Sequence, residues 1–322
     1  MRGDWLGKVK GIVLAELPLS VQAELPEWLV DRLRATMTDV EILSIGNAMQ
    51  QAAPLDLRVN TLLATRDEIL AGLHAEKVEA QATPWSPIGI RVKGKPALNK
   101  SPLFLGGKFE VQDEGSQLLG FLLAPKRNEM VVDFCAGAGG KTLMLGAMMN
   151  SQGRLYAFDV SEKRLANLKP RLKRSGLSNI HPQLIAHEND SKLKRLVGKI
   201  DRVLVDAPCS GLGTLRRNPD LKFRQSPQSI AELTLKQASI LSAASKLLKP
   251  GGRLVYATCS LLHEENRAIV DAFLSAHPEF VLCHAGEILI QQKIPLEIGE
   301  CLQLLPQVHG TDGFFAAVLE RN

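Results

Sequence analysis

The stretch that decides the fold reads Val131-Val132-Asp133-Phe134-Cys135-Ala136-Gly137-Ala138-Gly139-Gly140-Lys141-Thr142. A short apolar run, typical of a buried strand, leads into a glycine-rich loop and then into a helix. Glycines allow close backbone approach to a ligand, and the first turn of a helix offers free N–H groups. Because doubly wound sheets bind nucleotides at this position, the stretch predicts an α/β fold with a nucleotide-type site.

Two familiar glycine-rich loops do not match this stretch. A phosphate-binding loop of the form Gly-x-x-x-x-Gly-Lys-Thr would need glycine at position 135, where Cys135 stands. Gly137-x-Gly139 is half of a dinucleotide fingerprint, since Lys141-Thr142 occupies the region of the third glycine. Taken alone, the loop leaves a tight structural turn open as an alternative.

From Met130 onward, β-rich runs alternate with helical stretches, which indicates a parallel sheet of right-handed βαβ units. The predicted strands are Met130–Phe134, Arg154–Phe158, Ile180–Ala186, Asp201–Asp206, Arg253–Thr258, Phe280–Cys283 and Phe314–Glu320. The predicted helices are Lys141–Asn150, Glu162–Arg174, Ser229–Leu248 and His263–Ala276. Pro250-Gly251-Gly252 is interpreted as a helix stop before the next strand.

The first hundred residues show a different pattern. Apolar residues recur at three- or four-residue steps from Pro18 to about Asn47 and predict helix. One further helix and three short strands are predicted after it: Arg66–Ala75, Leu55–Leu63, Ile88–Val92 and Phe109–Val111. We therefore expect a helical segment at 1–50, a small α+β module at 51–108 and the main domain at 109–322.

The composition is ordinary for a globular protein, with 45% hydrophobic and 23% charged residues in 322. No stretch approaches the ~18 uninterrupted apolar residues of a spanning helix. The first residues lack the pattern of a secretory signal, so we expect a cytoplasmic protein without membrane contact. Five cysteines without a Cys-x-x-Cys pair argue against a disulfide framework or a bound metal and favour reduced thiols.

The net charge of +5 is unevenly distributed. Residues 162–259 hold 19 basic and 7 acidic side chains, whereas residues 260–322 hold 3 and 9. A localised basic face suggests a polyanionic partner such as nucleic acid. Charge alone leaves solvated amphipathic helices as an equal alternative.

Acidic residues follow the second and third predicted strands. Asp159 lies 24 residues after Cys135, the placement expected for a carboxylate that accepts ribose hydroxyl groups. NAD and S-adenosylmethionine both fit such a site, and a structural role in capping the helix after Ser161 is the alternative. Asn189-Asp190 could flank an adenine or form a simple turn.

Two cysteines follow the fourth and fifth predicted strands. Cys209 lies in Asp206-Ala207-Pro208-Cys209-Ser210-Gly211, and Cys259 lies in Ala257-Thr258-Cys259-Ser260. A lone free cysteine is usually an inert buried residue. Because both of these stand at the carboxyl edge of the sheet beside a cofactor loop, we interpret them as functional.

Six motifs in this order resemble the Sun/Nop-type family of RNA cytosine-carbon-5 methyltransferases. They are Gln112–Gln117, the Gly139–Thr142 loop, Asp206–Gly211, Arg216–Asp220, Thr258–Ser260 and His309–Phe315, and Pro54–Thr61 resembles the segment that precedes the family's catalytic domain. The resemblance covers residues 54–320 and implies a Rossmann-like class I methyltransferase sheet with a small RRM-like, RNA-binding module at 51–108. It further implies S-adenosylmethionine as cofactor and RNA as partner.

The resemblance also assigns roles to residues. A thiolate must add to carbon 6 of cytosine before carbon 5 can take a methyl group, and Cys259 is implied as that nucleophile. Cys209 is implied to assist elimination, Asp206 to hold the base and Lys141 to serve as an active-site cation. The implied cofactor contacts are Cys135, Ala136, Gly137, Ala138, Gly139, Gly140, Lys141, Asp159, Arg164, Asp190 and Asp206. Because Arg216 and Arg217 lie just after the Cys209 loop, we expect them to meet RNA phosphate, although surface charge would also explain them.

The sequence departs from the family pattern at Gly137-Ala138, where Ala-Pro is usual, and this change is expected to loosen the turn. The expected activity is methylation of ribosomal RNA by a monomer, with transfer RNA as the alternative substrate. An NAD oxidoreductase would not explain two strand-end cysteines. A catalytically silent RNA-binding protein is disfavoured because Cys209, Cys259 and Lys141 are intact. Cys283 and Cys301 are interpreted as packing residues.

Overall fold

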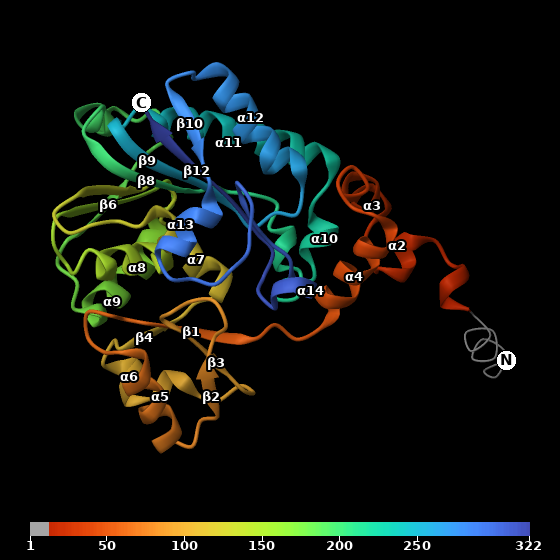
Figure 1. Cartoon of the computed structure of the whole chain (residues 1–322), viewed down its shortest axis with the longest axis horizontal. Coiled ribbons are helices and arrows are strands. Elements are labelled where there is room, and N and C mark those ends of the chain that lie inside the picture. The colour runs from red at the N-terminus through yellow and green to blue at the C-terminus, as the bar shows by residue number, and fades with distance from the viewer. Residues whose placement is uncertain (1–12) are drawn as a thin grey trace.

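The computed structural model describes residues 13–322, and these form three parts (Figure 1). A group of helices leads into a small four-stranded sheet, and a large sheet with helices on both faces follows. The predicted α/β fold with a small N-terminal α+β module is confirmed. The small sheet spans Leu55–Val111, and the domain boundaries at 50 and 108 remain predictions.

The large sheet has eight strands. In chain order they are β5 (Met130–Asp133), β6 (Arg154–Asp159), β7 (Ile180–Leu184), β8 (Ile200–Asp206), β9 (Leu248–Thr258), β10 (Phe280–Cys283), β11 (Leu302–Leu304) and β12 (Phe314–Arg321). They are arranged β10-β12-β9-β8-β5-β6-β7, with β11 paired to β12. The strands from β9 to β7 are parallel, and β10, β11 and β12 pair antiparallel. The chain order reverses beside β5, where sheets of this kind bind ligands.

Helices cover both faces of this sheet. One face carries α7 (Glu114–Leu123), α8 (Gly140–Met148), α9 (Glu162–Ser175) and α13 (Ala285–Gln291). The other carries α11 (Pro227–Ser245), α12 (Arg267–Ala276) and the 3₁₀ helix η3 (Ser191–Leu196). Successive residues of β5 alternate between the two cores, because side chains of a strand point to opposite faces. Val131 joins the first core and Val132 the second.

The small sheet is antiparallel throughout. Its strands are β1 (Leu55–Val59), β2 (Ala80–Ala82), β3 (Gly89–Val92) and β4 (Phe109–Val111), in the order β2-β3-β1-β4. Its helices are α5 (Arg66–Ala75) and α6 (Pro102–Leu105). The 3₁₀ helix η2 (Leu98–Lys100) lies between β3 and α6 in the chain. Leu57 and Val59 of β1 are fully buried against Ile69 of α5. The predicted α5 is confirmed, whereas β2 was not predicted.

The opposite face of β1 contacts the large domain. Asp56 accepts two hydrogen bonds from Arg91, at 2.7 and 2.9 Å, and one from the Glu114 backbone N–H at 3.2 Å. Asn60, which directly follows β1, donates from its Nδ2 to the Ser175 carbonyl oxygen, at the end of α9, at 2.9 Å. A single strand therefore serves the small core with one face and the domain contact with the other.

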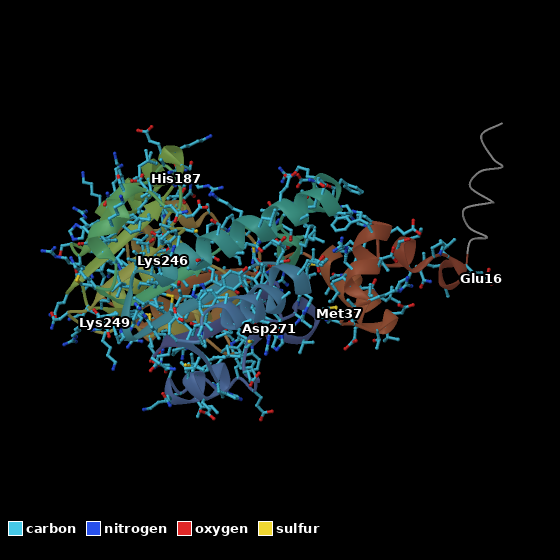
Figure 2. The ribbon with its side chains drawn as sticks, turned by 90° about the horizontal axis from the view of Figure 1, so that it is seen from above. Glu16, Met37, His187, Lys246, Lys249 and Asp271 are labelled. Carbon is cyan, nitrogen blue, oxygen red and sulfur yellow. The ribbon has the colours of Figure 1, made fainter. Side chains whose placement is uncertain are left out.

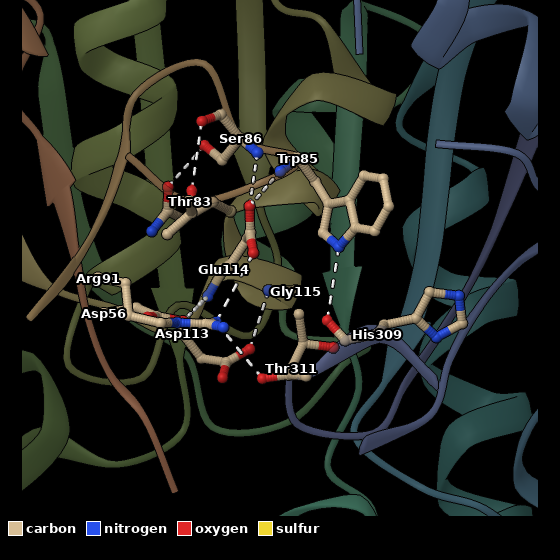
Figure 3. A network of polar contacts seen from close by, with 12 residues as sticks. Asp56, Thr83, Trp85, Ser86, Arg91, Asp113, Glu114, Gly115, His309 and Thr311 are labelled. Carbon is tan, nitrogen blue, oxygen red and sulfur yellow. Dashed lines mark hydrogen bonds and ion pairs between the residues drawn. The ribbon is translucent and has the colours of Figure 1, made fainter. Parts of the chain in front are cut away.

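Glu114 extends this contact into a buried network (Figure 3). The Glu114 carboxylate accepts hydrogen bonds from the backbone N–H groups of Trp85, at 2.6 Å, and Ser86, at 2.7 Å. The Trp85 indole N–H donates to His309 O at 3.5 Å, which reaches the segment before β12. Nearby, burial and the Asp312 carboxylate raise the pKa of Asp113 to about 6. The network fixes the small sheet on α7 and on the segment that precedes β12.

The N-terminal part from residue 13 to residue 50 is helical, as apolar spacing predicted, and it is divided into several short helices. It contains the 3₁₀ helix η1 (Leu14–Glu16), α2 (Leu19–Gln22), α3 (Glu27–Leu33) and α4 (Asp39–Gln50). Pro26 precedes α3, and a capping box between Thr38 and Glu41 starts α4, so local signals divide the apolar pattern. In the view from above, Glu16 and Met37 lie at the end of the molecule away from His187 and Lys246 (Figure 2).

Two further boundaries differ from prediction. Helix α11 ends at Ser245, and Pro250-Gly251-Gly252 lies inside β9, so its interpretation as a helix stop is wrong. The pairing of β8 with β9 shifts register here, because Ile200 pairs with Leu248 and Arg202 pairs with Arg253, so the extra residues of β9 bulge outward from the ladder. The predicted helix at 263–276 is divided into the 3₁₀ helix η5 (His263–Glu265) and α12. The remaining short elements are the 3₁₀ helix η4 (Leu212–Thr214), α10 (Leu221–Arg224) and α14 (Pro306–His309).

Candidate active site

The glycine-rich loop connects β5 to α8 by a turn that only glycine adopts without strain. Gly137 and Gly139 have φ angles of +56° and +84°, and a Cβ at Gly139 would lie 2.1 Å from the Leu168 side chain. The Gly139 N–H donates to Ala136 O at 2.9 Å, and Arg171 Nη1 donates to Ala138 O at 2.6 Å. The loop is therefore held from α9 even though position 138 lacks the proline that is usual in the family.

Asp159 ends β6 directly opposite this loop and is 4% exposed. Its Oδ2 accepts a hydrogen bond from the Gly137 N–H at 2.8 Å, and its Oδ1 accepts one from the Ser161 N–H at 2.7 Å. The cap of α9 is Ser161 itself, whose side chain accepts from the Arg164 N–H. Arg164 Nη1 lies 4.0 Å from Asp159 Oδ2. Asp159 thus joins the loop to the start of α9, and it lines a cleft.

The cleft has a volume of about 420 Å³ and lies along the carboxyl ends of β5, β6, β8 and β9. Eight predicted site residues line it: Cys135, Gly137, Ala138, Asp159, Arg164, Asp206, Cys209 and Cys259. Its apolar walls come from Val160, Ile185, Pro208 and Ile240. A flat apolar slot beside a carboxylate suits a nucleoside, which has an apolar base and a hydroxyl-bearing sugar.

Asp190 does not line this cleft. Its half-buried side chain accepts hydrogen bonds from the backbone N–H groups of Ala186, at 2.7 Å, and Lys192, at 2.9 Å, which makes it the cap of η3. The cleft wall at this end is instead formed by Glu188 and Lys236, which the sequence did not single out. Glu188 accepts from Lys236 Nζ at 2.6 Å and Ser239 Oγ at 2.5 Å. Although burial opposes the shift, these bonds lower the pKa of Glu188 to about 2.

Cys209 and Cys259 meet at the far end of the cleft. They follow the neighbouring parallel strands β8 and β9, and their sulfur atoms are 3.4 Å apart. The contact with Cys259 and burial raise the pKa of the Cys209 thiol well above its ordinary value. Cys209 is therefore protonated at neutral pH, so it can donate a hydrogen bond to the sulfur atom of Cys259. In this pair, the Cys209 thiol can stabilise a thiolate on Cys259 by a hydrogen bond.

Lys141 and Asp206 place a charged pair beside the cysteines. Lys141 Nζ lies 2.7 Å from Asp206 Oδ2, and both side chains are largely buried. Burial lowers the pKa of Lys141, but Asp206 and, to a smaller extent, Cys259 outweigh it, so the net pKa is raised. The ammonium group is therefore charged at the point where a Cys259 thiolate would form.

Asp133 lies beneath the loop and is fully buried. Thr142 Oγ1 donates to its Oδ2 at 2.7 Å, whereas its Oδ1 has no hydrogen-bond partner. Burial raises the pKa of Asp133 to about 7, Thr142 and Lys141 oppose this rise, and Asp206 and Asp159 contribute to it. The carboxyl group is therefore about half protonated near pH 7 and largely protonated at lower pH.

This shift predicts a pH-dependent stability. The folded-state pKa of Asp133 lies above its ordinary value, so its contribution to folding is present at low pH and is lost as pH rises from about 4 to about 7. The free energy of unfolding of Asp133→Asn, minus that of the wild type, should therefore be about 2–3 kcal/mol larger at pH 8 than at pH 5. Urea unfolding at both pH values measures this gain, with exposed Asp67→Asn as control. An equal difference at both pH values would contradict the prediction.

Arg216 and Arg217 are not free surface cations. Arg216 Nε lies 2.8 Å from Asp312 Oδ1, and Arg217 pairs with Asp312 at 2.5 Å and with Asp113 at 2.9 Å. Arg216 is 6% exposed in its side chain, so the structure gives it a buried structural position. Arg217 is partly exposed, and its contact with RNA phosphate remains a prediction.

Some basic residues of the stretch at 162–259 form ion pairs within the protein. Arg171 and Arg174 of α9 both pair with Glu110 of β4, at 3.0 and 2.5 Å. Arg202 pairs with Glu129 at 2.7 Å. These pairs fasten α9 to the small sheet and stabilise one end of the large sheet, so the charge excess of the sequence overstates the free positive surface.

The other cysteines have different surroundings. Cys283 and Cys301 pack at the edges of the two cores of the large sheet, and burial raises the pKa of each thiol. Burial, with the carboxylates of Asp133, Asp206 and Asp159, raises the pKa of Cys135 well above its ordinary value. Within residues 13–322, no three His, Cys, Asp or Glu side chains are grouped as metal ligands. In that same range no helix has the length and apolar character needed to cross a bilayer.

Comparison with known families gives two matches. Residues 120–320 match the model of a family described as 16S rRNA methyltransferase RsmB/F. Residues 25–99 match the ferredoxin-like domain of RsmF/B-like methyltransferases, in agreement with the small sheet.

Individual proteins are similar over nearly the whole chain. A probable ribosomal RNA small subunit methyltransferase B of Synechocystis sp. is 36% identical over 310 residues, which are 95% of this chain and 69% of that protein. Ribosomal RNA small subunit methyltransferase B of Shewanella oneidensis is 37% identical over 320 residues, which are 97% and 72%.

Solved structures share the architecture. A methyltransferase homolog from Pyrococcus horikoshii is 28% identical with a TM-score of 0.81, covering 97% of this chain and 100% of its own. NSun6 from the same organism has the same TM-score of 0.81 at 21% identity, covering 92% and 98%, and shows likeness of fold.

Proposed function

Because this chain belongs to the RsmB/F family of 16S rRNA methyltransferases, we propose that it methylates carbon 5 of a cytosine in ribosomal RNA with S-adenosylmethionine as methyl donor. One observation carries the proposal most directly. Two cysteine sulfur atoms lie in contact at the carboxyl edge of the sheet, and the same cleft holds a glycine-rich cofactor loop. Carbon-5 methylation of cytosine needs a sulfur nucleophile beside a methyl donor, and this arrangement supplies both places.

The residues of the cleft fit S-adenosylmethionine. Asp159 offers carboxylate oxygens to ribose hydroxyl groups. The start of α8 at Gly140 and Lys141 offers backbone N–H groups to the carboxylate of the methionine part, since those of Gly137 and Gly139 already donate to Asp159 and Ala136. Val160 and Ile185 offer an apolar slot to the adenine, and Glu188 is placed to contact its edge. When bound, this cofactor supplies a methyl group activated by its positively charged sulfur.

Cys259 acts as the nucleophile in this proposal. Its thiolate adds to carbon 6 of the cytosine, which makes carbon 5 electron-rich enough to accept a methyl group. Lys141 stabilises the thiolate by its positive charge, and Asp206 accepts hydrogen bonds from the base. Loss of the carbon-5 proton to a base then allows the bond between carbon 6 and sulfur to break.

Cys209 assists this last stage. As the sulfur of Cys259 departs it regains negative charge, and the protonated Cys209 thiol lies 3.4 Å away to stabilise it. The products are an RNA with 5-methylcytosine, S-adenosylhomocysteine, one proton, which the base releases to solvent, and the enzyme with both cysteines restored.

Bisulfite sequencing of total RNA from cells with and without the gene tests the proposal. A cytosine in small-subunit ribosomal RNA that resists conversion only when the gene is present is the expected result. Protection of a transfer RNA cytosine instead would move the activity to the alternative substrate. Complete conversion of all cytosines in both samples would contradict RNA cytosine methylation.

Of the three acidic residues predicted at the cofactor site, Asp159 and Asp190 can be distinguished by substitution. Asp159→Asn should raise the Kd for S-adenosylmethionine about 10- to 100-fold, because a hydrogen-bonded charge is worth roughly 1.5–3 kcal/mol. Asp190→Asn is the matched control and should leave the Kd unchanged, since Asp190 lies outside the cleft and caps η3. Isothermal titration calorimetry of each variant measures both values. A larger loss in Asp190→Asn than in Asp159→Asn would restore Asp190 to the cofactor site.

A further inference from the structure

Glu265 is a fully buried carboxylate at the end of η5. Its Oε1 accepts hydrogen bonds from the Ser210 backbone N–H at 2.8 Å and from Gln237 Nε2 at 3.0 Å. Its Oε2 accepts from the Ser210 hydroxyl at 2.5 Å and from the Ser260 hydroxyl. Four neutral donors therefore converge on one carboxylate.

These donors belong to both cysteine loops. Ser210 directly follows Cys209, and Ser260 directly follows Cys259. The two hydroxyl oxygens are themselves 3.2 Å apart. Gln237 Nε2 also donates to the carbonyl oxygen preceding Cys209, that of Pro208, at 3.0 Å. The carboxylate thus links the neighbour of one cysteine to the neighbour of the other.

The backbone around Glu265 is fixed from further sides. The buried Tyr256 hydroxyl donates to Glu265 O at 2.7 Å, and Asn266 Nδ2 donates to Ser260 O at 3.0 Å. Burying a carboxylate costs free energy unless its oxygens are hydrogen-bonded, and loss of the acceptor leaves several buried donors unpaired. A group of this kind specifies one arrangement of the segments that it joins.

We propose that Glu265 is a positioning residue that holds the Cys209 and Cys259 sulfur atoms in contact for catalysis. The inference rests on the proposed function and extends it to a residue outside the cleft lining. Adjacent strands alone lie about 4.8 Å apart, and the loops beyond their ends are free to diverge. The link through Ser210 and Ser260 keeps them together at the 3.4 Å sulfur contact.

Glu265 also makes the surroundings of the two cysteines different. Contact with Cys259 and burial are the larger causes of the raised Cys209 pKa, and the nearby Glu265 carboxylate adds to it. The groups that face Cys209 are therefore a second thiol and a buried carboxylate, while Lys141 and Asp206 form their pair nearer Cys259. This arrangement keeps Cys209 as the thiol and leaves Cys259 beside the cation.

The kinetic test compares Glu265→Gln with Glu264→Gln. Glutamine keeps the size of the side chain but places an NH₂ group against donors, whereas the neighbouring Glu264 pairs with Arg32 on the surface. Glu265→Gln should lower kcat about 10- to 100-fold with the KM for RNA and the Kd for S-adenosylmethionine unchanged, because a misplacement of about 1 Å has an effect of that size. Glu264→Gln should match the wild type. A wild-type kcat in Glu265→Gln would overturn the proposal.

A second test needs neither RNA nor methyl donor, so it is independent of the proposed function. Diamide oxidises two adjacent thiols to a disulfide, taking up their two protons and two electrons as it becomes a hydrazine. The Cys209–Cys259 disulfide, followed by peptide mass spectrometry, should form about tenfold more slowly in Glu265→Gln than in the wild type or Glu264→Gln. Equal rates in all three proteins would show that Glu265 does not hold the sulfur atoms together.

Folding of the variant is checked by its melting temperature. If Glu265→Gln does not fold, Ser260→Ala serves instead, because it removes one donor and leaves the carboxylate with the other three. It should slow both methylation and disulfide formation in the same direction by a smaller factor, and wild-type rates in both assays would overturn the proposal. Absence of RNA methylation by the wild type, together with a Glu265-dependent disulfide, would instead refute the proposed function alone.

Discussion

Cys259→Ala should lower the rate of RNA cytosine methylation by about four to six orders of magnitude, the effect of removing a catalytic nucleophile. Without its sulfur atom nothing adds to carbon 6, and carbon 5 stays too electron-poor to accept a methyl group. Cofactor affinity should be unchanged, because the proposed contacts lie in the loop after β5 and at Asp159. Transfer of a radiolabelled methyl group to RNA transcripts and calorimetric titration of S-adenosylmethionine measure the two effects.

Cys301→Ala is the matched control for that experiment. Cys301 is partly buried and packs at the edge of the core on the α11 side of the sheet, away from the cleft lining. Its replacement should change stability more than activity. Wild-type turnover by Cys259→Ala would show that another residue is the nucleophile.

Cys209→Ala is expected to accumulate a covalent complex between protein and RNA. In this variant Cys259 can still add to carbon 6, but the thiol that lies 3.4 Å from its sulfur atom is gone, so elimination is slowed. We expect a protein band of reduced mobility on denaturing gels, sensitive to ribonuclease, together with a fall in turnover of about 10²–10⁴-fold.

The double variant Cys209→Ala/Cys259→Ala tests the origin of that band. It should give no covalent complex, because the attacking sulfur is absent. The reverse pattern, with a complex in Cys259→Ala and none in Cys209→Ala, would exchange the roles of the two cysteines.

The sequence predicted those parts of the site whose positions follow from local sequence patterns. A buried strand followed by glycines identified the loop, and the strand ends placed Asp159, Cys209 and Cys259 at one edge of the sheet. This worked because parallel strands in such a sheet all end on the same side. Helix α5 was also predicted with its bounds, since Thr65 and Glu68 form a capping box directly before an apolar stripe.

The rest depends on contacts between distant segments, which one sequence does not reveal. Arg216 was expected at the surface, but its partner Asp312 lies 96 residues further along the chain. Glu188 lines the cleft beside its partner Lys236, which lies 48 residues further along the chain. Asp190, only two residues after Glu188, instead caps η3. Glu265 lies within the segment predicted to be helical and belongs to none of the motifs that predicted the site. Only folding brings its carboxylate to Ser210.

Strand β1 has a consequence for how the molecule unfolds. Leu57 and Val59 belong to the small core, while Asp56 and Asn60 on the other face hold α7 and the end of α9. Unfolding of β1 would open the small core and also break its contacts with the large domain, so we expect the small sheet and the large domain to behave as one cooperative unit in hydrogen exchange. Amide protons of β1 should therefore exchange at the global rate, and a ligand in the distant cleft should slow them as much as those of β5. The small sheet should therefore keep its position on the large domain until the whole molecule unfolds.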